Sequence, residues 1–490
     1  MTDSTDFRPE ARAPKGFIDR RARDLAAERR IVEAVSRVYE TCGFEQLDTG
    51  AFEYADALGK FLPDAERPNA GVFALQDDDD QWMALRYDLT APLARFCAQY
   101  WETLPKPFRR YAVGTVWRNE KPGPGRFREF VQCDADTVGS ARPEADAEII
   151  AMAGQGLAAA GLPVGAAVIK INNRKLLNGL LTVAGVDSAG QKLAVLRAVD
   201  KLDRLGLEGV QLLLGAGRKD ESGAFTPGAG LNAKGIDAVL AFVQAGSGRG
   251  EVLGKLADII GGSAEGDEGL EELARIDAAL TGLGVGPDKA LFDASVVRGL
   301  EYYTGAVFEA ELLLQTLDEK GQPMRFGSVG GGGRYDDLVA RFTGERTPAT
   351  GFSFGVSRLA AALRAAGRAE EVQARGPVVI LVLDQSAMTE YFAVCAELRS
   401  AGIAAEVYLG TSGMRPQMKY ADRRLSPAAV IIGGDELAAG TVTLKDLDLG
   451  RELAAGITDN AEWREARPGQ QTIPRAGLVA AIAKILEPRP

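Results

Sequence analysis

Residues 110–139, RYAVGTVWRNEKPGPGRFREFVQCDADTVG, read as two strands joined by a loop rich in proline and glycine. Strands that run out and back in this way pair antiparallel, so the chain is expected to build a sheet that contains a long hairpin. Other short strand patterns occur at 44–49, 82–87, 291–295 and 306–314, and the returning strand of the hairpin is expected at 127–137. An amphipathic helical pattern occurs at 25–41, and further helices are expected at 88–98 and 388–401. Short strands joined by loops and flanked by helices predict an α+β fold with a mixed or antiparallel sheet, and not a doubly wound parallel one.

Changes in pattern along the chain predict its domain organisation. We expect a sheet-containing core in two pieces, residues 1–170 and 288–370, separated by a mainly helical insertion at 171–287 that is rich in Leu, Ala and Gly. In the last part, 376–490, strands and helices alternate. That alternation predicts a separate α/β domain with a substantially parallel sheet, followed by a C-terminal extension.

The composition excludes several classes of function. The chain contains no histidine, so a Ser-His-Asp triad, a His-ligated zinc site and a haem ligand are impossible. Its net charge of −11 argues against indiscriminate coating of nucleic acid, although a local basic surface can still grip one RNA. The polar N-terminus and the absence of a run of about eighteen apolar residues predict a cytoplasmic protein without a membrane span. Four cysteines without CxxC spacing are expected to be small buried apolar residues and not zinc ligands: Cys42, Cys97, Cys133 and Cys395.

Arginines mark two segments of chemical interest. At the end of the first hairpin strand Arg118 and Glu120 share one face, and Phe130 lies on the returning strand. Such a face can hold a phosphate, accept from an amino group and stack on a base, but a solvated, salt-bridged hairpin explains the same residues equally well. Arg298 sits in an apolar run, DASVVRGLEYYTG, and needs a partner there, either a bound anion or an internal carboxylate.

Glycines mark a third segment. Residues 330–333 are four consecutive glycines, which allow close approach of the backbone to a ligand or to another strand. A strand at 351–354 then runs through Gly355 into a helix that carries Arg358 early in its length. Helix N-termini favour negative charge, so this pattern suits the binding of an anion.

Taken in order, these segments resemble the motifs of the class II aminoacyl-tRNA synthetases, and specifically the histidyl-tRNA synthetases. The hairpin resembles motif 2 of the class, GFSFGVSRL resembles motif 3, and RGLEYYTGAVFE with GGGGRYDDLV resembles the histidine-specific signature. MKYADRRLSPAAVIIGGDELAAGTVTLKDLDLG is similar to that family's anticodon-binding domain. The resemblance covers nearly the whole chain and indicates a divergent bacterial branch. It implies a catalytic domain with the class II antiparallel sheet, a helical insertion and a C-terminal α/β anticodon-binding domain.

The resemblance implies a role in ATP binding for five matched residues. Arg118 would hold the α-phosphate and the amino-acid carboxylate, while Glu120 would face the adenine amino group. Phe130 would stack under the adenine, and Arg358 would cover its other side and reach the γ-phosphate. Arg298 would stabilise the α-phosphate during attack, which makes it the second implied catalytic residue beside Arg118. The implied cofactor is ATP accompanied by Mg²⁺, without a metal site of the protein's own.

The resemblance also implies a site for the amino acid. Asp88 and Thr90 would hold the α-amino group, and Gln132, Asp136 and Tyr303 would line a pocket for the imidazole ring. Reading an imidazole requires polar partners for both ring nitrogens. Aspartate stands at 88 and 136 where many bacterial members have glutamate, which shortens the reach by one methylene. The full implied histidine site is Asp88, Thr90, Arg118, Gln132, Asp136, Arg298, Tyr302 and Tyr303.

The activity that this family resemblance implies is ATP-dependent attachment of histidine to the 3′ end of its tRNA, by a homodimer. A candidate tRNA-binding cluster lies in the last domain, where a solvated helix face is the competing explanation: Arg415, Lys419, Arg423 and Arg424. The hairpin tip KPGPGRF lacks the polar residues that many members use near the extra 5′ nucleotide of the tRNA, so no role is predicted there. The alternative function is that of the non-catalytic regulatory subunit of ATP phosphoribosyltransferase, which shares the catalytic fold.

Overall fold

The computed structural model divides into two compact units, Met1–Ala369 and Glu370–Pro490. It describes residues 8–58, 71–122, 127–186, 188–219, 223, 225–296, 302–314, 316–317, 323–324, 326–367, 375–454 and 469–487. Within these residues, no helix is both long enough and apolar enough to cross a bilayer.

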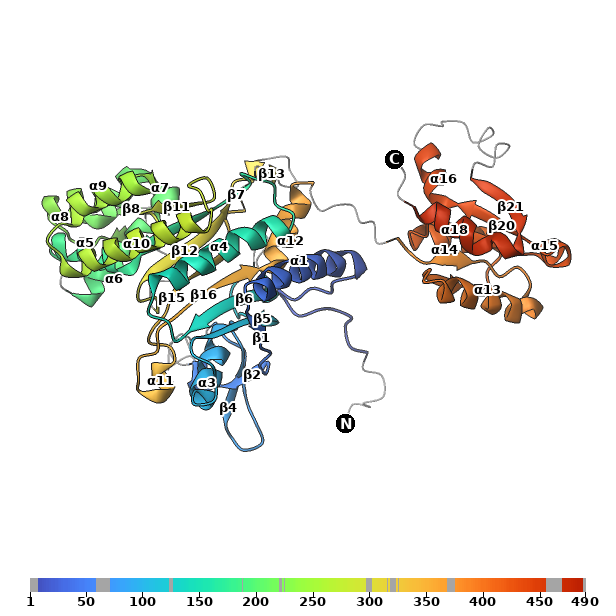
Figure 1. The fold of residues 1–490 in the computed structure, drawn as a ribbon, viewed down its shortest axis with the longest axis horizontal. Helices are drawn as coiled ribbons and strands as arrows, with labels where there is room; N and C mark the ends of the chain where they lie inside the picture. The colour runs from blue at the N-terminus through green and yellow to red at the C-terminus, as the bar shows by residue number, and fades with distance from the viewer. Residues whose placement is uncertain are drawn as a thin grey trace. The chain divides into compact units, whose positions relative to one another are not determined.

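The first unit is built on a nine-stranded sheet in the order β1-β5-β6-β16-β15-β12-β7-β11-β10 (Figure 1). All neighbouring strands pair antiparallel except β1 with β5 and β7 with β11, so the predicted mixed, largely antiparallel sheet is confirmed. The bounds are β1 Glu45–Gln46, β5 Phe108–Trp117, β6 Glu129–Val138, β7 Ala167–Asn173, β10 Ser247–Gly248, β11 Ala290–Asp293, β12 Ala306–Leu312, β15 Ser328–Arg334 and β16 Ala349–Gly355.

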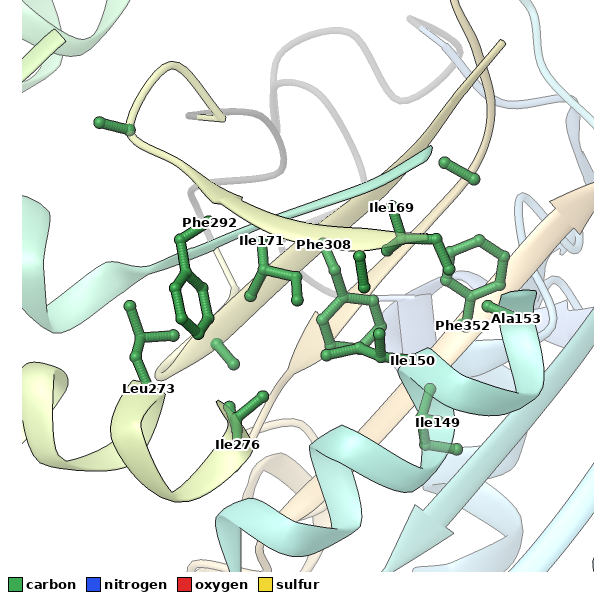
Figure 2. Close-up of a cluster of buried hydrophobic side chains, with 14 of the residues drawn as sticks. Ile149, Ile150, Ala153, Ile169, Ile171, Leu273, Ile276, Phe292, Phe308 and Phe352 are labelled. Atoms are coloured by element: carbon green, nitrogen blue, oxygen red, sulfur yellow. The ribbon is translucent and has the colours of Figure 1, made fainter. Parts of the chain in front are cut away.

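The period-two pattern of the strands gives this sheet two different faces. One face is apolar: Phe308, Phe352 and Ile171 point to a core formed with helices α1 (Ala22–Thr41), α4 (Pro143–Ala159) and α12 (Val356–Ala365). Figure 2 shows part of this core, with side chains of α4 and α10 (Ala264–Gly282) meeting those of the strands. The alternate strand positions form a second face that carries Gln132, Asp134, Glu309 and Ser353, and the candidate site lies there.

The residues between β7 and β11 are mainly helical. The helices are α5 (Arg174–Val183), α6 (Ala189–Val199), α7 (Leu202–Leu214), α8 (Ala233–Val243), α9 (Gly250–Ile260) and α10, with a short hairpin of β8 (Gly217–Lys219) and β9 (Phe225–Pro227). Side chains of Ser188, Asn232 and Ser263 cap three of them by accepting from an N–H three residues on. Helix α10 packs against α4, and β10 pairs with β11 of the large sheet. The helices therefore share the core of the first unit, and the bounds 171 and 287 stay a prediction.

Smaller elements lie beside the hairpin of β5 and β6. A three-stranded sheet in the order β2-β4-β3 joins β2 (Phe52–Tyr54), β3 (Ala74–Gln76) and β4 (Trp82–Leu85), next to α2 (Ala55–Leu58), α3 (Thr90–Tyr100) and α11 (Ala340–Thr343). Strands β13 (Thr316–Leu317) and β14 (Pro323–Met324) form a separate pair. The strand expected at 44–49 is reduced to β1, because only Glu45 and Gln46 reach a partner strand.

The second unit has a five-stranded sheet in the order β18-β17-β19-β20-β21. Its strands are β17 (Val378–Ile380), β18 (Ala405–Val407), β19 (Ala428–Ile431), β20 (Thr441–Asp446) and β21 (Gln470–Pro474), with helices α13 (Met388–Ser400), α14 (Met414–Arg423), α15 (Gly434–Ala439), α16 (Leu447–Ala454) and α18 (Leu478–Leu486). The pairings of β17 are parallel, whereas those of β20 are antiparallel. The prediction of a substantially parallel sheet is therefore wrong for strands β20 and β21. Residues 432–440, which join β19 to β20, are fewer than the dozen or so that a crossover between parallel strands needs.

The cysteines behave largely as expected from the sequence. Cys97, Cys133 and Cys395 are buried, whereas Cys42 is half-buried at the end of α1. Burial raises the pKa of the Cys97 thiol to about 12, so it is neutral at physiological pH and packs as a small apolar group.

Candidate active site

A cavity of about 380 Å³ opens on the polar face of the nine-stranded sheet. Its walls come from segments far apart in the chain: the start of α3, the hairpin of β5 and β6, residues 302–303, strands β12, β15 and β16, and the first turn of α12. Antiparallel neighbours place Asp134 of β6, Ser353 of β16 and Gly331 of β15 in one row across the floor. The sheet therefore collects the motifs of the sequence at one place.

The four consecutive glycines form most of β15 and do two different things. On the apolar face, a Cβ at Gly332 would lie 2.7 Å from the Phe308 ring, and one at Gly330 would lie 2.7 Å from the Phe352 ring. These two rings stack with their centroids 6.1 Å apart, so the glycines make room for core packing. On the cavity face, Gly333 lies against the Tyr303 ring, and Gly331 leaves the floor open. The sequence left approach to a ligand or to a strand as alternatives, and the geometry provides for both.

Asp88 and Thr90 line the cavity where α3 begins. The Asp88 carboxylate accepts from the backbone N–H of Thr90 at 3.1 Å and of Ala91 at 2.9 Å, which caps the helix. The helix expected to begin at Asp88 thus has its first residue at Thr90. Capping fixes the orientation of the carboxylate, so both residues are held at the cavity wall by the backbone of α3.

Arg118 follows the last residue of β5 and lies between two aromatic rings. Its guanidinium carbon is 4.4 Å from the centroid of Tyr87 and 5.1 Å from that of Phe130. The Tyr87 hydroxyl donates to the Glu120 carboxylate at 2.8 Å. Arg118, Glu120 and Phe130 all line the cavity. An arginine held by ring stacking, with a carboxylate beside it, suits an anion next to a hydrogen-bonding base.

Gln132, Tyr302 and Tyr303 form a second part of the cavity wall. The Gln132 amide donates to the Ser353 hydroxyl at 2.7 Å, and the hydroxyls of the two tyrosines are 2.9 Å apart. Burial raises the pKa of Tyr302 and of Tyr303, so both hydroxyls stay protonated at physiological pH. This part of the cavity offers neutral donors and acceptors to a small polar ring.

Asp136 is not among the residues that line the cavity. Its carboxylate lies 2.9 Å from the guanidinium of Arg110, which is fully buried, and accepts a short hydrogen bond from the Tyr335 hydroxyl. A Cβ on Gly351 would collide with the same carboxylate, so Asp136 fills the space above that glycine. Its predicted contact with an imidazole stays a prediction.

Arg358 lines the cavity from the first turn of α12 and donates to the carbonyl oxygen of Phe326. Arg298, the other arginine singled out from the sequence, lies outside the described residues, as does Arg126 of the hairpin tip.

Comparison with protein families gives two matches. Residues 16–359 match the model described as histidyl-tRNA synthetase, and residues 377–482 match the model described as anticodon binding domain. The chain belongs to the histidyl-tRNA synthetase family. A histidine–tRNA ligase of Caulobacter vibrioides is 76% identical over 99% of this chain and 98% of its own length. One of Cereibacter sphaeroides is 54% identical over 99% of both chains.

Solved structures of the family show the same fold. The crystal structure of histidyl-tRNA synthetase from Nostoc sp. covers 98% of this chain and 100% of its own, at 29% identity and a TM-score of 0.73. A Bacillus halodurans structure, named as an ATP phosphoribosyltransferase regulatory subunit/histidyl-tRNA synthetase, covers 84% of this chain and 97% of its own at 21% identity and a TM-score of 0.66. At that identity it shows likeness of fold alone.

The candidate tRNA-binding residues lie at the second unit's helix α14. Arg415, Lys419 and Arg423 recur every four residues and are exposed, so they share one face of the helix. Arg424, which follows the helix, is also exposed, but it pairs with Glu406 at 3.0 Å. The geometry thus presents three of the four cations as one basic stripe.

Two residues of the site were not found from the sequence in their present roles: Tyr87, which contacts the lining residues Arg118 and Glu120, and Ser353, which lines the cavity. Tyr87 precedes Asp88 in the matched segment, so its position was a usable signal, but nothing in the pattern indicated that it would hold Glu120. Ser353 lies within the motif-3-like strand and joins Gln132 to the floor. Both contact residues far away in the sequence, which a linear pattern does not display.

Replacing Tyr87 with phenylalanine is expected to raise the KM for ATP about tenfold, because Glu120 loses the hydrogen bond that orients it, on the order of 1.5 kcal/mol. Burial raises the pKa of Tyr87 to about 12, so the hydroxyl is a donor throughout the working range of pH. ATP–pyrophosphate exchange at varied ATP measures the effect. Tyr54→Phe, at a tyrosine that is 55% exposed, serves as the control and should leave the KM unchanged. An unchanged KM in Tyr87→Phe would show that Glu120 needs no such support.

Proposed function

We propose that this chain is an aminoacyl-tRNA ligase that activates histidine with ATP and transfers it to the 3′ end of histidine tRNA. The main observation in support of this proposal is that residues from separate sequence motifs line one cavity, in a chain of the histidyl-tRNA synthetase family. The histidine–tRNA ligases that align over almost the full length support the same activity.

In the first step, a carboxylate oxygen of histidine attacks the α-phosphorus of ATP. The new oxygen–phosphorus bond gives histidyl-adenylate, and the bond from the α-phosphorus to the bridging oxygen of pyrophosphate breaks, so that pyrophosphate leaves. This displacement requires chiefly positioning and neutralisation of charge. Arg118, whose guanidinium stacks on Tyr87 and Phe130, would hold both reacting groups, a role that rests on the family resemblance and that this stacking supports. Arg298 would stabilise the α-phosphate, a role that rests on the family resemblance. The reaction needs no imidazole from the protein, which agrees with a chain that contains no histidine.

In the second step, a hydroxyl of the terminal tRNA ribose attacks the acyl carbon, and AMP leaves. Asp88 and Thr90 would hold the α-amino group, and Gln132 with Tyr302 and Tyr303 would surround the ring. Magnesium would bind mainly through the ATP phosphates, as its preference for few protein carboxylates and several waters suggests. Glu309 lines the cavity and fits as such a carboxylate, and the ion would neutralise charge on the leaving pyrophosphate.

Histidine-dependent ATP–pyrophosphate exchange tests this function. The exchange should require histidine among the twenty amino acids, and the same preparation should charge histidine tRNA. Absence of exchange with a folded protein would reject the function and favour the alternative, a regulatory subunit of ATP phosphoribosyltransferase. Arg118, Glu120, Phe130 and Arg358 at one cavity support the catalytic reading over that alternative.

We further propose that helix α14 contacts the tRNA. Replacing Arg415, Lys419 and Arg423 together with alanine should raise the KM for tRNA and reduce the slope of log KM against log salt by about 2 to 3, because up to three phosphate contacts are lost. The exchange reaction should be unaffected, since it does not involve tRNA. Lys484→Ala, an exposed charge on α18, is the control. An unchanged salt slope in the triple variant would assign this helix face to solvent.

A homodimer acting in the cytoplasm is proposed from the family resemblance. The family resemblance implies that the helix at 25–41, observed as α1, helps to form the subunit contact. A groove between α1 and α4 lies on that helix and is lined by Ala34, Val38 and Ala159. Light scattering should give about twice the chain mass of 52.0 kDa.

A further inference from the structure

Residues 15–17, which precede α1, lie against the hairpin of β5 and β6 and are not among the residues that line the cavity. We call them the N-terminal strap. The backbone N–H of Arg128, just before β6, donates to the Gly16 carbonyl oxygen at 2.9 Å, and its Nη1 donates to the Lys15 carbonyl oxygen at 3.2 Å. Backbone and side chain of one arginine thus fasten the strap to the returning strand of the hairpin.

Gly16 allows the strap to come this close to the hairpin. Its φ is +87°, a backbone conformation that favours glycine. A Cβ on Gly16 would lie 2.8 Å from Cδ of Arg128 and 2.9 Å from Cγ of Pro122, so a side chain there would have to displace the strap. The Phe17 and Phe73 ring centroids are 5.7 Å apart, and the Phe73 centroid is 6.0 Å from the Arg128 guanidinium carbon. The strap is therefore fitted closely around the Arg128 side chain.

Arg128 also holds the backbone of two residues that line the cavity. Its Nε donates to the Glu120 carbonyl oxygen at 3.0 Å, and its own carbonyl oxygen accepts from the backbone N–H of Arg118 at 2.9 Å. Arg118 and Glu120 line the cavity, whereas Arg128 is not among the lining residues. The rigid fork of a guanidinium can donate in two directions at once, here to Glu120 and to Lys15. A chain of contacts therefore runs from the strap through Arg128 to the backbone of Glu120.

We propose that Arg128 is a positioning residue for ATP, and that the N-terminal strap holds Arg128 in place. This inference rests on the proposed function, in which Glu120 faces the adenine amino group. The Tyr87 hydroxyl orients the carboxylate of Glu120, and Arg128 fixes the backbone of the same residue. Arg128 touches no substrate in this role and acts through Glu120. Its loss should therefore weaken the binding of ATP and leave the binding of histidine unchanged.

Replacing Arg128 with methionine tests the guanidinium, because methionine keeps an apolar chain beside Phe73. In ATP–pyrophosphate exchange, Arg128→Met should raise the KM for ATP about fivefold, the effect of losing one solvent-accessible hydrogen bond from a charged group, while kcat and the KM for histidine stay within about twofold. Arg128→Lys should recover only part of this loss, because one ammonium group lacks the fork that spans both carbonyl oxygens. Arg12→Ala, at a side chain that is 76% exposed, is the control and should leave both KM values unchanged.

A second pair of variants tests the strap. Gly16→Ala places a methyl group against Arg128 and Pro122, so it should also raise the KM for ATP, while the KM for histidine stays unchanged. Gly165→Ala is the matched control, because Gly165 has a similar φ of +78° but a Cβ there would meet no atom within 4 Å. It carries the backbone strain without the collision, so it should lower the melting temperature and keep the KM for ATP. Gly16→Ala combined with Arg128→Met should be no worse than the more affected single variant, because both remove the same support.

Each other result would overturn the proposal. Equal rises in the KM for ATP and for histidine in Arg128→Met would indicate general damage to the hairpin. Effects of Gly16→Ala and Arg128→Met that multiply in the double variant would mean that the strap and Arg128 act independently. Unchanged exchange constants in Arg128→Met reject the inference alone, and a raised KM for tRNA in that variant would then assign the guanidinium to tRNA. Absence of exchange in the wild type would instead reject the proposed function, and calorimetric titration with ATP would still show whether Arg128→Met weakens its binding.

Discussion

Replacing Arg118 with alanine is expected to lower kcat/KM for histidine-dependent pyrophosphate exchange by about 10³-fold, at the upper end of what one electrostatic donor to a transition state contributes. The guanidinium lies between the rings of Tyr87 and Phe130, so its orientation is set before substrates arrive. In the role proposed for Arg118, an alanine would leave charge on the α-phosphate without this donor, and it would remove the stacking surface for both rings. Because the interaction strengthens as charge develops, the loss should appear mainly in kcat.

The charge and the shape of Arg118 can be separated by a second variant. Arg118→Lys keeps a cation but loses the planar fork and the ring stacking, so it should recover only part of the activity. Arg346→Ala, at an arginine whose side chain is 62% exposed, is the matched control on the same unit and should keep full exchange. Exchange within threefold of the wild type in Arg118→Ala would show that the ring-clamped guanidinium does not act on the reacting phosphate.

Local patterns predicted most of the fold. The strand expected at 127–137 is observed as Glu129–Val138, and the helix expected at 388–401 is observed as Met388–Ser400. These elements have one apolar face with a clear period, so a short window of sequence is sufficient. The two-residue strand β1 was overestimated because its extent depends on where Tyr111 and its neighbours on β5 offer partners. Pairing across the sheet is not encoded in the strand alone.

The residues of the candidate site also show which features can be predicted from the sequence and which depend on pairing across the sheet. Period two places Gln132, Asp134 and Asp136 on one face of β6, and the sequence goes no further than that. Which carboxyl faces the cavity is decided by Arg110 on the neighbouring strand and by Tyr335. The latter lies almost two hundred positions later in the chain. Motif resemblance selected Asp136, whose carboxylate pairs with Arg110 in the folded chain, whereas Asp134 lines the cavity. A functional residue whose role depends on its partners on neighbouring strands therefore cannot be identified from the sequence pattern alone.

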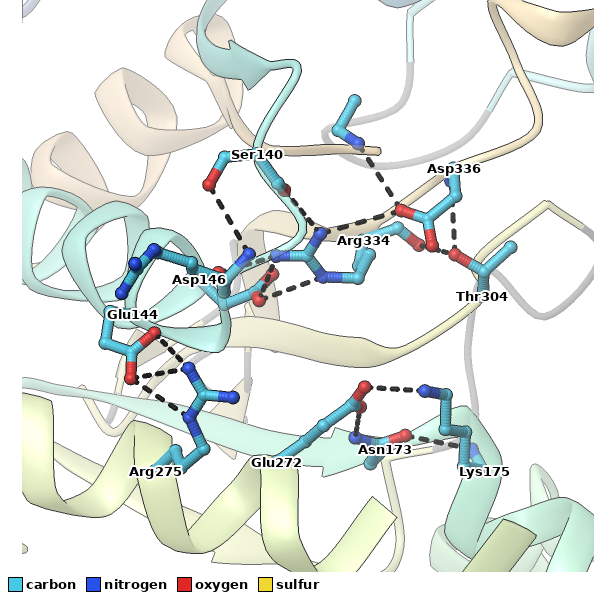
Figure 3. Close-up of polar contacts among 12 residues, drawn as sticks. Ser140, Glu144, Asp146, Asn173, Lys175, Glu272, Arg275, Thr304, Arg334 and Asp336 are labelled. Atoms are coloured by element: carbon cyan, nitrogen blue, oxygen red, sulfur yellow. Dashed lines mark hydrogen bonds and ion pairs between the residues drawn. The ribbon is translucent and has the colours of Figure 1, made fainter. Parts of the chain in front are cut away.

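Replacing Arg334 with alanine should destabilise the first unit by about 3–5 kcal/mol, as expected when one partner of a buried ion pair is removed. Arg334 is 4% exposed and binds the Asp146 carboxylate through Nε at 3.0 Å and Nη2 at 2.6 Å. It also donates to the carbonyl oxygens of Ser140 and Arg142, so it joins β15 to α4 and to the segment before it (Figure 3). Burial raises the pKa of Asp146 to about 6, although Arg334 lowers it. Without the arginine the pKa of this carboxyl would rise further, so the folded variant would have to hold an unpaired buried charge or take up a proton at pH 7.5.

The same helix provides a matched control for this variant. Glu144, two residues before Asp146 on α4, makes a bidentate pair with Arg275 of α10, but both side chains are 43% exposed (Figure 3). Arg275→Ala should change stability by at most about 1 kcal/mol, because exposed pairs are solvated in either state. In thermal unfolding of the full chain at pH 7.5, the transition of the first unit should fall by roughly 4–7 °C in Arg334→Ala and by about 1 °C in Arg275→Ala. Adding Asp146→Asn to Arg334→Ala should restore part of the lost stability, since the remaining amide carries no charge. Equal destabilisation by Arg334→Ala and Arg275→Ala would mean that the burial of Asp146 is not the reason why Arg334 is needed.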